Sequence, residues 1–134
     1  MPVLPLHRAT TLILCLLGSP SLLAATLVIT DTQHPASASN DVQLILLDHP
    51  ANLEAKLSTD LPPDPAQAQA LLQQRMTPEL SIQISQAHQD VANAWSLGVT
   101  KIPAVVVDQQ YVIYGEPDVQ KALDGIAKFR ERQP

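Results

Sequence analysis

Residues 98–107 have the sequence GVTKIPAVVV, and this stretch decides the fold. After the polar residues 108–110, the chain continues with YVIYG at 111–115. Both halves are rich in β-branched and aromatic residues, which is typical of two antiparallel strands joined by a turn. Pro103 stands at the entry to the first strand, where a residue without an N–H does not interrupt the hydrogen-bonded ladder. The sequence therefore predicts a β-hairpin with a proline loop in front of it.

Toward the N-terminus, an amphipathic helix leads into this loop. Apolar residues recur at spacings of three and four from Leu80 to Trp95, and Gly98 follows where a helix end is expected. We expect the aromatic side chains Trp95, Tyr111 and Tyr114 to pack in the core and on the sheet rather than to form a stacking surface. The helix before it is predicted to start at Asp64 as the N-cap, with Pro65 in the first turn and Gln67 as the capping-box partner. Thr77 and Pro78 restart the helical pattern.

The first half of the chain contains two candidate strands, residues 26–30 and 41–48. The second is almost continuously apolar, so we expect it in the centre of the sheet. A parallel crossover normally takes a dozen or more residues, usually helical, and residues 31–40 are short for that. This loop holds one helical turn from Pro35, or the two strands pair in another way. A short helix capped by Asn52 is expected after the second strand, and a last helix from Glu116 and Pro117.

These elements predict an α/β fold: a small mixed sheet with a C-terminal β-hairpin, flanked by helices, and a shortened first crossover. The proline loop resembles the cis-proline stretch of thioredoxin-fold proteins, and so does the order of the elements. The resemblance implies a cis Ile102–Pro103 bond and a loop that touches extended peptide segments. In that fold the loop faces the redox cysteines, whose place is taken here by the stretch with His34. The groove that we predict is formed by Thr100, Lys101, Ile102 and Pro103, together with Asp31, His34 and Pro35.

The first 25 residues have the pattern of an export signal. A weakly basic start with His7 and Arg8 precedes an apolar run at 11–17, and Ala24 and Ala25 offer small residues for cleavage. The run is interrupted well before the ~20 residues that a membrane-spanning helix needs. We therefore expect a signal peptide over 1–25, cleaved near Ala25, and one domain over 26–134 that is periplasmic and has no stable membrane insertion.

Charge and cysteine content exclude several activities. The chain has a formal charge of −5, and loss of Arg8 with the signal makes it one unit more negative. Direct nucleic-acid binding depends on neutralising phosphates, so we do not expect it. The single cysteine, Cys15, leaves with the signal, so the mature chain has no thiol for disulfide exchange.

No residue pattern in the mature chain predicts catalysis, a cofactor or a metal site. His34, His49 and His88, with Asp31 and Asp48, could in principle supply metal ligands, but they lack the close spacing of metal-binding motifs. His34 and Pro35 are open to two interpretations: a binding site that faces Pro103, or an ordinary turn formed by Asp31 and Pro35. We expect no enzyme activity.

A second resemblance covers nearly all of the mature chain. The segments 30–35, 46–48 and 61–65, and above all 94–115, look like a small family of exported proteins encoded in integrating conjugative elements of proteobacteria. The resemblance implies a non-enzymatic periplasmic accessory of a type IV secretion-like DNA transfer apparatus. Its partners would be other periplasmic or envelope proteins of that apparatus. The alternative is a thioredoxin-like chaperone or thiol–disulfide helper that acts on partner proteins without cysteines of its own.

Overall fold

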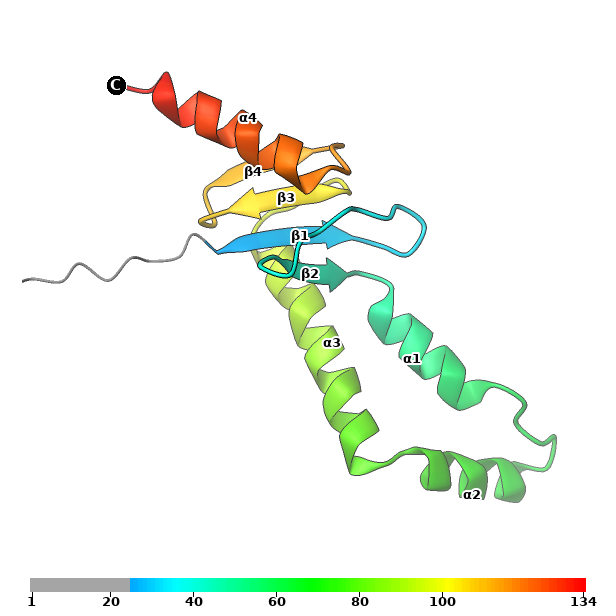
Figure 1. Ribbon diagram of the computed structural model, residues 1–134. Helices are drawn as coiled ribbons and strands as arrows, with labels where there is room; N and C mark the ends of the chain where they lie inside the picture. Colours follow the sequence, from blue (N-terminus) through cyan, green and yellow to red (C-terminus); the bar gives the residue numbers. More distant parts are fainter. Residues whose placement is uncertain (1–24) are drawn as a thin grey trace, which may run out of the picture.

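A four-stranded sheet forms the centre of the computed structural model, which describes residues 25–134 (Figure 1). The sheet order is β2-β1-β3-β4. β1 pairs with β2 in parallel and with β3 antiparallel, and β3 pairs with β4 antiparallel. Together with the four helices found in residues 25–134, this sheet makes a mixed α/β fold. The strands are β1 (Thr26–Thr30), β2 (Gln43–Leu46), β3 (Ala104–Val107) and β4 (Tyr111–Tyr114).

The predicted hairpin is confirmed as β3 and β4. Its turn needs left-handed backbone, and Asp108 and Gln109 have φ values of 54° and 55°. β3 begins at Ala104, directly after Pro103, and the Ile102–Pro103 bond is cis as expected. All four residues of β3 are buried, because β3 lies between two other strands and is covered on both faces.

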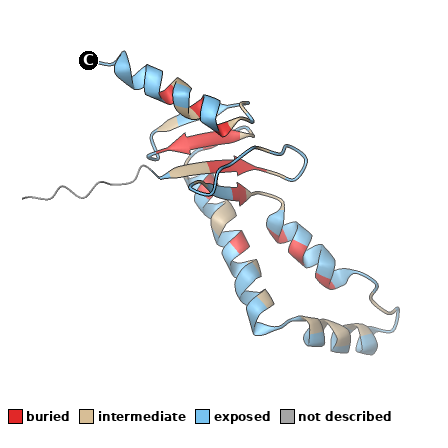
Figure 2. Ribbon diagram, viewed as in Figure 1, coloured by how far each residue is buried: buried red, intermediate tan, exposed pale blue. Residues whose placement is uncertain are grey.

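The two faces of the sheet are covered by different elements. Helix α4 (Val119–Glu131) packs on one face, where Val28, Val105 and Ile126 belong to one core cluster. The C-terminal end of helix α3 (Pro78–Ser96) packs on the other face, where Ile29 and Ala94 belong to a second cluster. Burial is concentrated in the two central strands, as Figure 2 shows.

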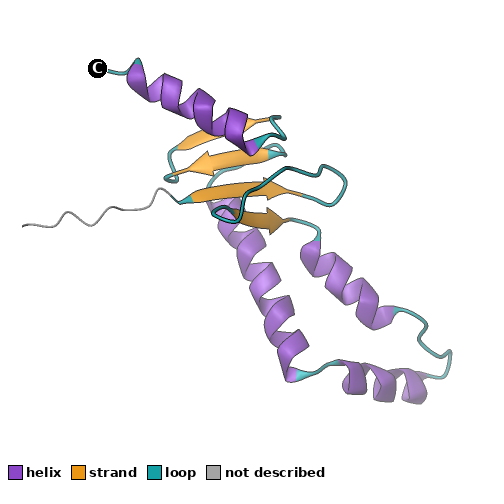
Figure 3. Ribbon diagram, viewed as in Figure 1, coloured by secondary structure: helices purple, strands orange, loops and turns teal. Residues whose placement is uncertain are grey.

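The connection between β1 and β2 crosses the α4 side of the sheet without a helix (Figure 3). Ala36 and Val42 pack against the core cluster under α4, and the N–H of Ser37 donates to the carbonyl of Pro117 at 2.9 Å. The first crossover is short, as predicted. Of the alternatives left open, the helical turn from Pro35 is absent from this loop, and the two strands pair in parallel.

β2 is an edge strand, so the prediction that it lies in the centre of the sheet was wrong. It is also shorter than the predicted 41–48. The hairpin takes the other side of β1, which leaves β2 with one neighbour. Its apolar residues serve different purposes: Ile45 is buried in the cluster with Ala94, whereas Leu44 is 45% exposed.

Helices α1 (His49–Ser58), α2 (Pro65–Arg75) and α3 project from the sheet as an arm (Figure 1). α1 packs on α3 through Leu53 and Leu57, whereas α2 has no buried residue. The predicted cap of α2 is confirmed, because the side chain of Asp64 accepts from the N–H of Gln67. α3 begins at Pro78, where the pattern was predicted to restart, and the side chain of Thr77 accepts from the N–H of Leu80. No helix within residues 25–134 is long and apolar enough to cross a membrane.

Two helix starts differ from the prediction. α1 begins at His49 rather than after Asn52, because Pro50 fits the first turn, where its missing N–H is not needed. α4 begins at Val119 rather than at Glu116 and Pro117. The carboxylate of Asp118 accepts from the N–H groups of Gln120 and Lys121 and so fixes this start.

Arg75 joins the ends of α1 and α2. Its Nη1 donates to the carbonyls of Leu57 at 2.8 Å and Thr59 at 2.6 Å, which are unpaired acceptors at a helix C-terminus. Arg75→Met keeps the aliphatic stem and removes the donors. A hydrogen bond to a charged group contributes about 1.5–3 kcal/mol, so amide hydrogen exchange in α2 should accelerate about tenfold or more. Arg132→Met is the control, because Arg132 bonds only within its own helix region, to Lys128. Unchanged exchange in α2 would contradict this account of Arg75.

Candidate functional site

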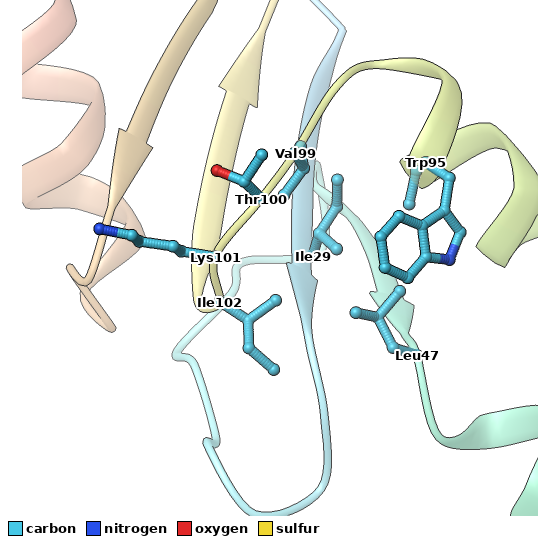
Figure 4. Close-up of a pocket in the computed structure, with 8 residues that line it drawn as sticks. Ile29, Leu47, Trp95, Val99, Thr100, Lys101 and Ile102 are labelled. Carbon is cyan, nitrogen blue, oxygen red and sulfur yellow. The ribbon is translucent and has the colours of Figure 1, made fainter.

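An apolar pocket of about 220 Å³ lies between the end of α3 and the proline loop, residues 98–103 (Figure 4). β1 and the residue after β2 form its floor. Its lining residues are Ile29, Leu47, Ala94, Trp95, Val99, Thr100, Lys101 and Ile102. We call this pocket with its rim the groove.

The position of the groove follows from how α3 ends. Gly98 has φ +72°, a left-handed conformation that favours glycine and lets the chain turn sharply out of the helix. Val99 is then buried in the same cluster as Ala94, and the loop lies across the pocket from Trp95 (Figure 4). Trp95 itself is 65% exposed, so a large apolar side chain stands open at the rim. The prediction that Trp95 packs in the core was wrong.

The proline loop is held from the side of β4. The N–H of Gly115 donates to the carbonyl of Pro103 at 2.8 Å, and the N–H of Thr100 donates to the hydroxyl of Tyr114 at 3.4 Å. Lys101 is the charged residue of the lining, and its ammonium group points away from Trp95 in Figure 4. The groove is thus an apolar slot with one cation at its outer rim.

Asp31 organises the turn that follows β1. Its Oδ1 accepts from the N–H of Gln33 at 3.0 Å and from the N–H of His34 at 2.8 Å, and lies 2.7 Å from Nδ1 of His34. The hydrogen bond from the His34 side chain is the main reason why the pKa of Asp31 lies below its ordinary value. Residues 31–34 therefore form a turn organised by Asp31, and Pro35 is exposed beside it.

A second carboxylate ties the same turn to the end of β2. Oδ2 of Asp48 accepts from the N–H of Thr32 at 3.1 Å and from the Thr32 hydroxyl. The side-chain hydrogen bond from Thr32 is the largest cause of the lowered pKa of Asp48. Because the folded-state pKa is depressed, this contact stabilises the fold above the ordinary pKa of 3.8, and the contribution disappears as the pH falls through the folded-state pKa.

Thr32→Val removes the hydroxyl donor and should raise the pKa of Asp48 toward 3.8. The variant should be less stable than the parent at neutral pH, and the difference should vanish well below 3.8. NMR titration of the Asp48 carboxyl measures the pKa, and denaturation at neutral pH and at a pH well below 3.8 measures the difference in stability. Thr59→Val is the control, because the Thr59 hydroxyl donates to the carbonyl of Ala55 rather than to a carboxylate. An unchanged Asp48 titration in Thr32→Val would refute the assignment.

The structure brings together some of the predicted groove residues and separates others. Thr100, Lys101 and Ile102 line the groove, and Pro103 follows directly. Asp31, His34 and Pro35 do not line it. Their loop continues over the α4 side of the sheet, whereas the groove belongs to the α3 side. The prediction that one extended partner segment touches both the proline loop and the turn with Asp31, His34 and Pro35 stays a prediction.

The histidines of residues 25–134 are dispersed. His34 pairs with Asp31, and Nε2 of His88 lies 2.9 Å from a carboxylate oxygen of Glu54, which links α3 to α1. Within the described part of the chain, no three His, Cys, Asp or Glu residues are grouped to hold a metal ion. What the groove offers is apolar contact, with Lys101 as its one charged lining residue.

Residues 23–132 match the model of a family described as a protein of unknown function, DUF1525, and the chain belongs to this family. No curated protein and no solved structure matches the chain.

Proposed function

We propose that this protein is a non-enzymatic periplasmic accessory of the DNA transfer apparatus of an integrating conjugative element, and that it acts through protein contacts. The observation that supports this proposal is the groove, an apolar slot beside the proline loop with an exposed Trp95 at its rim. An exposed tryptophan next to a pocket is typical of the residues that dominate protein–protein binding.

The proposal includes a thioredoxin-like fold. A parallel pair followed by an antiparallel hairpin and a closing helix supports it, as does the proline directly before β3. The helix that normally joins the first two strands is replaced by the loop under α4, and the chain from residue 25 onward has no cysteine. Binding at the loop without thiol chemistry is therefore the function that we assign to this fold here.

The location is part of the proposal and rests on the sequence of residues 1–25. Residues 1–24 lie outside the described part, so the support is the signal-like pattern alone. Mass spectrometry of the protein from the periplasmic fraction should give a chain that starts at or near Thr26. An intact chain that begins with Met1 and sediments with the inner membrane would reject this part.

Transfer assays test the function directly. A strain without the gene should transfer the element less efficiently, and the wild-type gene should restore transfer. A photo-crosslinking residue at Lys101, which lines the groove, should capture an envelope protein encoded by the same element. The same residue at Ile82, 69% exposed on α3, is the control and should not capture that protein. Normal transfer without the gene would overturn the proposal.

A chaperone-like helper is the second candidate, favoured by the apolar character of the groove lining. Such a protein would bind extended apolar segments of many sequences. The purified protein should then slow the aggregation of unrelated unfolded proteins, and Trp95→Ala should lose that effect. If the residue at Lys101 captures a single element-encoded partner and the protein has no effect on aggregation, the accessory function is supported and the chaperone-like function is excluded.

A further inference from the structure

The free edge of β4 carries a second interaction surface, independent of the groove. Gly115 donates to Pro103, so the odd-numbered residues of β4 exchange their hydrogen bonds with β3. Bonding alternates along an antiparallel strand, so the N–H and C=O groups of Val112 and Tyr114 point outward from the sheet. Their side chains are also open, 36% and 41% exposed. Unpaired backbone groups of this kind are a template for another strand.

Natural sheets protect such an edge with charges or proline, and the strand itself has neither. The charged groups beside it belong to α4: Arg130 lies over the ring of Tyr111, and Arg132 lines the hollow next to Val112. Residues 109–115, QQYVIYG, contain no charged side chain and no proline. Asp108, just before them, is paired with Arg130. For a chain with a net charge of −5, an uncharged strip is where two copies can approach with least repulsion.

We propose that β4 pairs antiparallel with β4 of a second copy of this chain, so that the two sheets join into one across a two-fold axis. The outward-pointing backbone groups belong to the even-numbered residues Val112 and Tyr114, so these residues must form the hydrogen-bonded pairs between the two copies, and this sets the register. Val112 lies opposite Tyr114 of the second copy, with both hydrogen bonds exchanged, and Ile113 lies opposite its own equivalent on the axis.

The side chains agree with this register. On the face away from α4, it places Val112 beside Tyr114 of the other copy, twice by symmetry. A β-branched residue opposite an aromatic one is a stabilising cross-strand pair. On the α4 face, Tyr111 lies opposite Gly115, which has no side chain to collide with it. A hollow of about 430 Å³ between α4 and β4, lined in part by Gly125 and Phe129, leaves room there, and Phe129 is 46% exposed.

The other edge of the sheet is less suitable for a second copy. Acidic residues flank β2, namely Asp41 before it and Asp48 after it. Asp90 of α3 lines the hollow next to Leu44 and Ile45. Two such edges would bring carboxylates together in a chain that is already negatively charged. The residues of β4 carry no charge and the neighbouring Arg132 is a cation, so the edge of β4 is the one that we assign.

Sedimentation velocity of the protein, expressed from its complete gene and purified, tests the pairing between about 1 μM and about 1 mM. Twice the monomer mass should appear as the concentration rises. Val112→Lys should weaken association about tenfold or more, because an edge lysine blocks strand addition. Val112→Pro should do the same, since its missing N–H faces outward and a proline is tolerated there. Ile82→Lys, on exposed α3, is the control and should still associate.

A cysteine on the axis gives a second measurement. In Cys15→Ser with Ile113→Cys, the new thiol is the only one in the chain. Directly opposite residues of this pair lie about 4.5 Å apart between Cα atoms, within the range for a disulfide. Mild oxidation should crosslink this variant and leave the matched Ile82→Cys variant monomeric.

A chain that stays monomeric up to about 1 mM overturns the proposal. So does a dimer that Val112→Lys and Val112→Pro leave intact, or an Ile113→Cys variant that crosslinks no better than Ile82→Cys. If the edge instead takes up a strand of a different protein while the chain alone stays monomeric, the second copy is excluded as its occupant.

Discussion

Trp95→Ala should reduce partner binding in the groove by about 30-fold or more and leave the fold intact. Truncation of a tryptophan that anchors an interface costs about 2 kcal/mol or more, which corresponds to that factor. The side chain is 65% exposed, so its loss should change the free energy of unfolding by no more than about 0.5 kcal/mol. The yield of the crosslink from Lys101 and the transfer frequency of the same cells measure the effect.

The control for this substitution lies on the same helix. Ile82 is 69% exposed on α3 and does not line the groove, so Ile82→Ala should leave both crosslink yield and transfer unchanged. Equal losses in the two variants would mean that α3 binds through another surface. Full binding by Trp95→Ala would exclude the groove as the contact site.

Ile29→Ala should have the largest effect on stability. Ile29 is fully buried in the central strand β1, below the groove, in the cluster with Ala94 and Val106. Deleting a buried isoleucine to alanine costs about 2–5 kcal/mol, a large part of the 5–15 kcal/mol that holds a typical domain. Urea denaturation should therefore show a much lower midpoint.

Ile82→Ala again provides the comparison, because it removes the same atoms from an exposed site and should cost no more than about 0.5 kcal/mol. A loss below about 1 kcal/mol for Ile29→Ala would contradict the burial of β1 between two covered faces.

The hairpin and the proline loop could be predicted because their signals are local. Pro103 and the valines that follow stand next to one another in the sequence, and the turn residues 108–110 separate two short runs. The caps of α2 and α3 at Asp64 and Thr77 are equally local, because each contact spans three residues.

The position of β2 could not be predicted in the same way. Strand order depends on pairing between residues far apart in the chain, here of β1 with β3 across more than seventy residues. The apolar character of residues 41–48 indicated burial on both faces. In the structure, Ile45 is buried, Leu47 lines the groove, and Leu44 remains exposed.

Trp95 shows the limit of helical periodicity. Ala94 and Trp95 both follow the apolar stripe of α3, and spacing alone does not separate them. The small side chain of Ala94, 2% exposed, takes the position in the core cluster on this face of the sheet, which turns the next residue to the rim. The sequence signal for the site was the pair of Ala94 and Trp95 at the end of the apolar stripe, a small residue next to a bulky one.

The arm has a consequence for how the molecule diffuses. α3 has 19 residues, so it extends about 28 Å, and its N-terminal end lies away from the sheet (Figure 1). With α2 at its outer end and no buried residue there, the monomer should experience more friction than a sphere of equal mass. It should therefore leave a gel-filtration column early, with the apparent size of a larger protein, even when each particle is one chain.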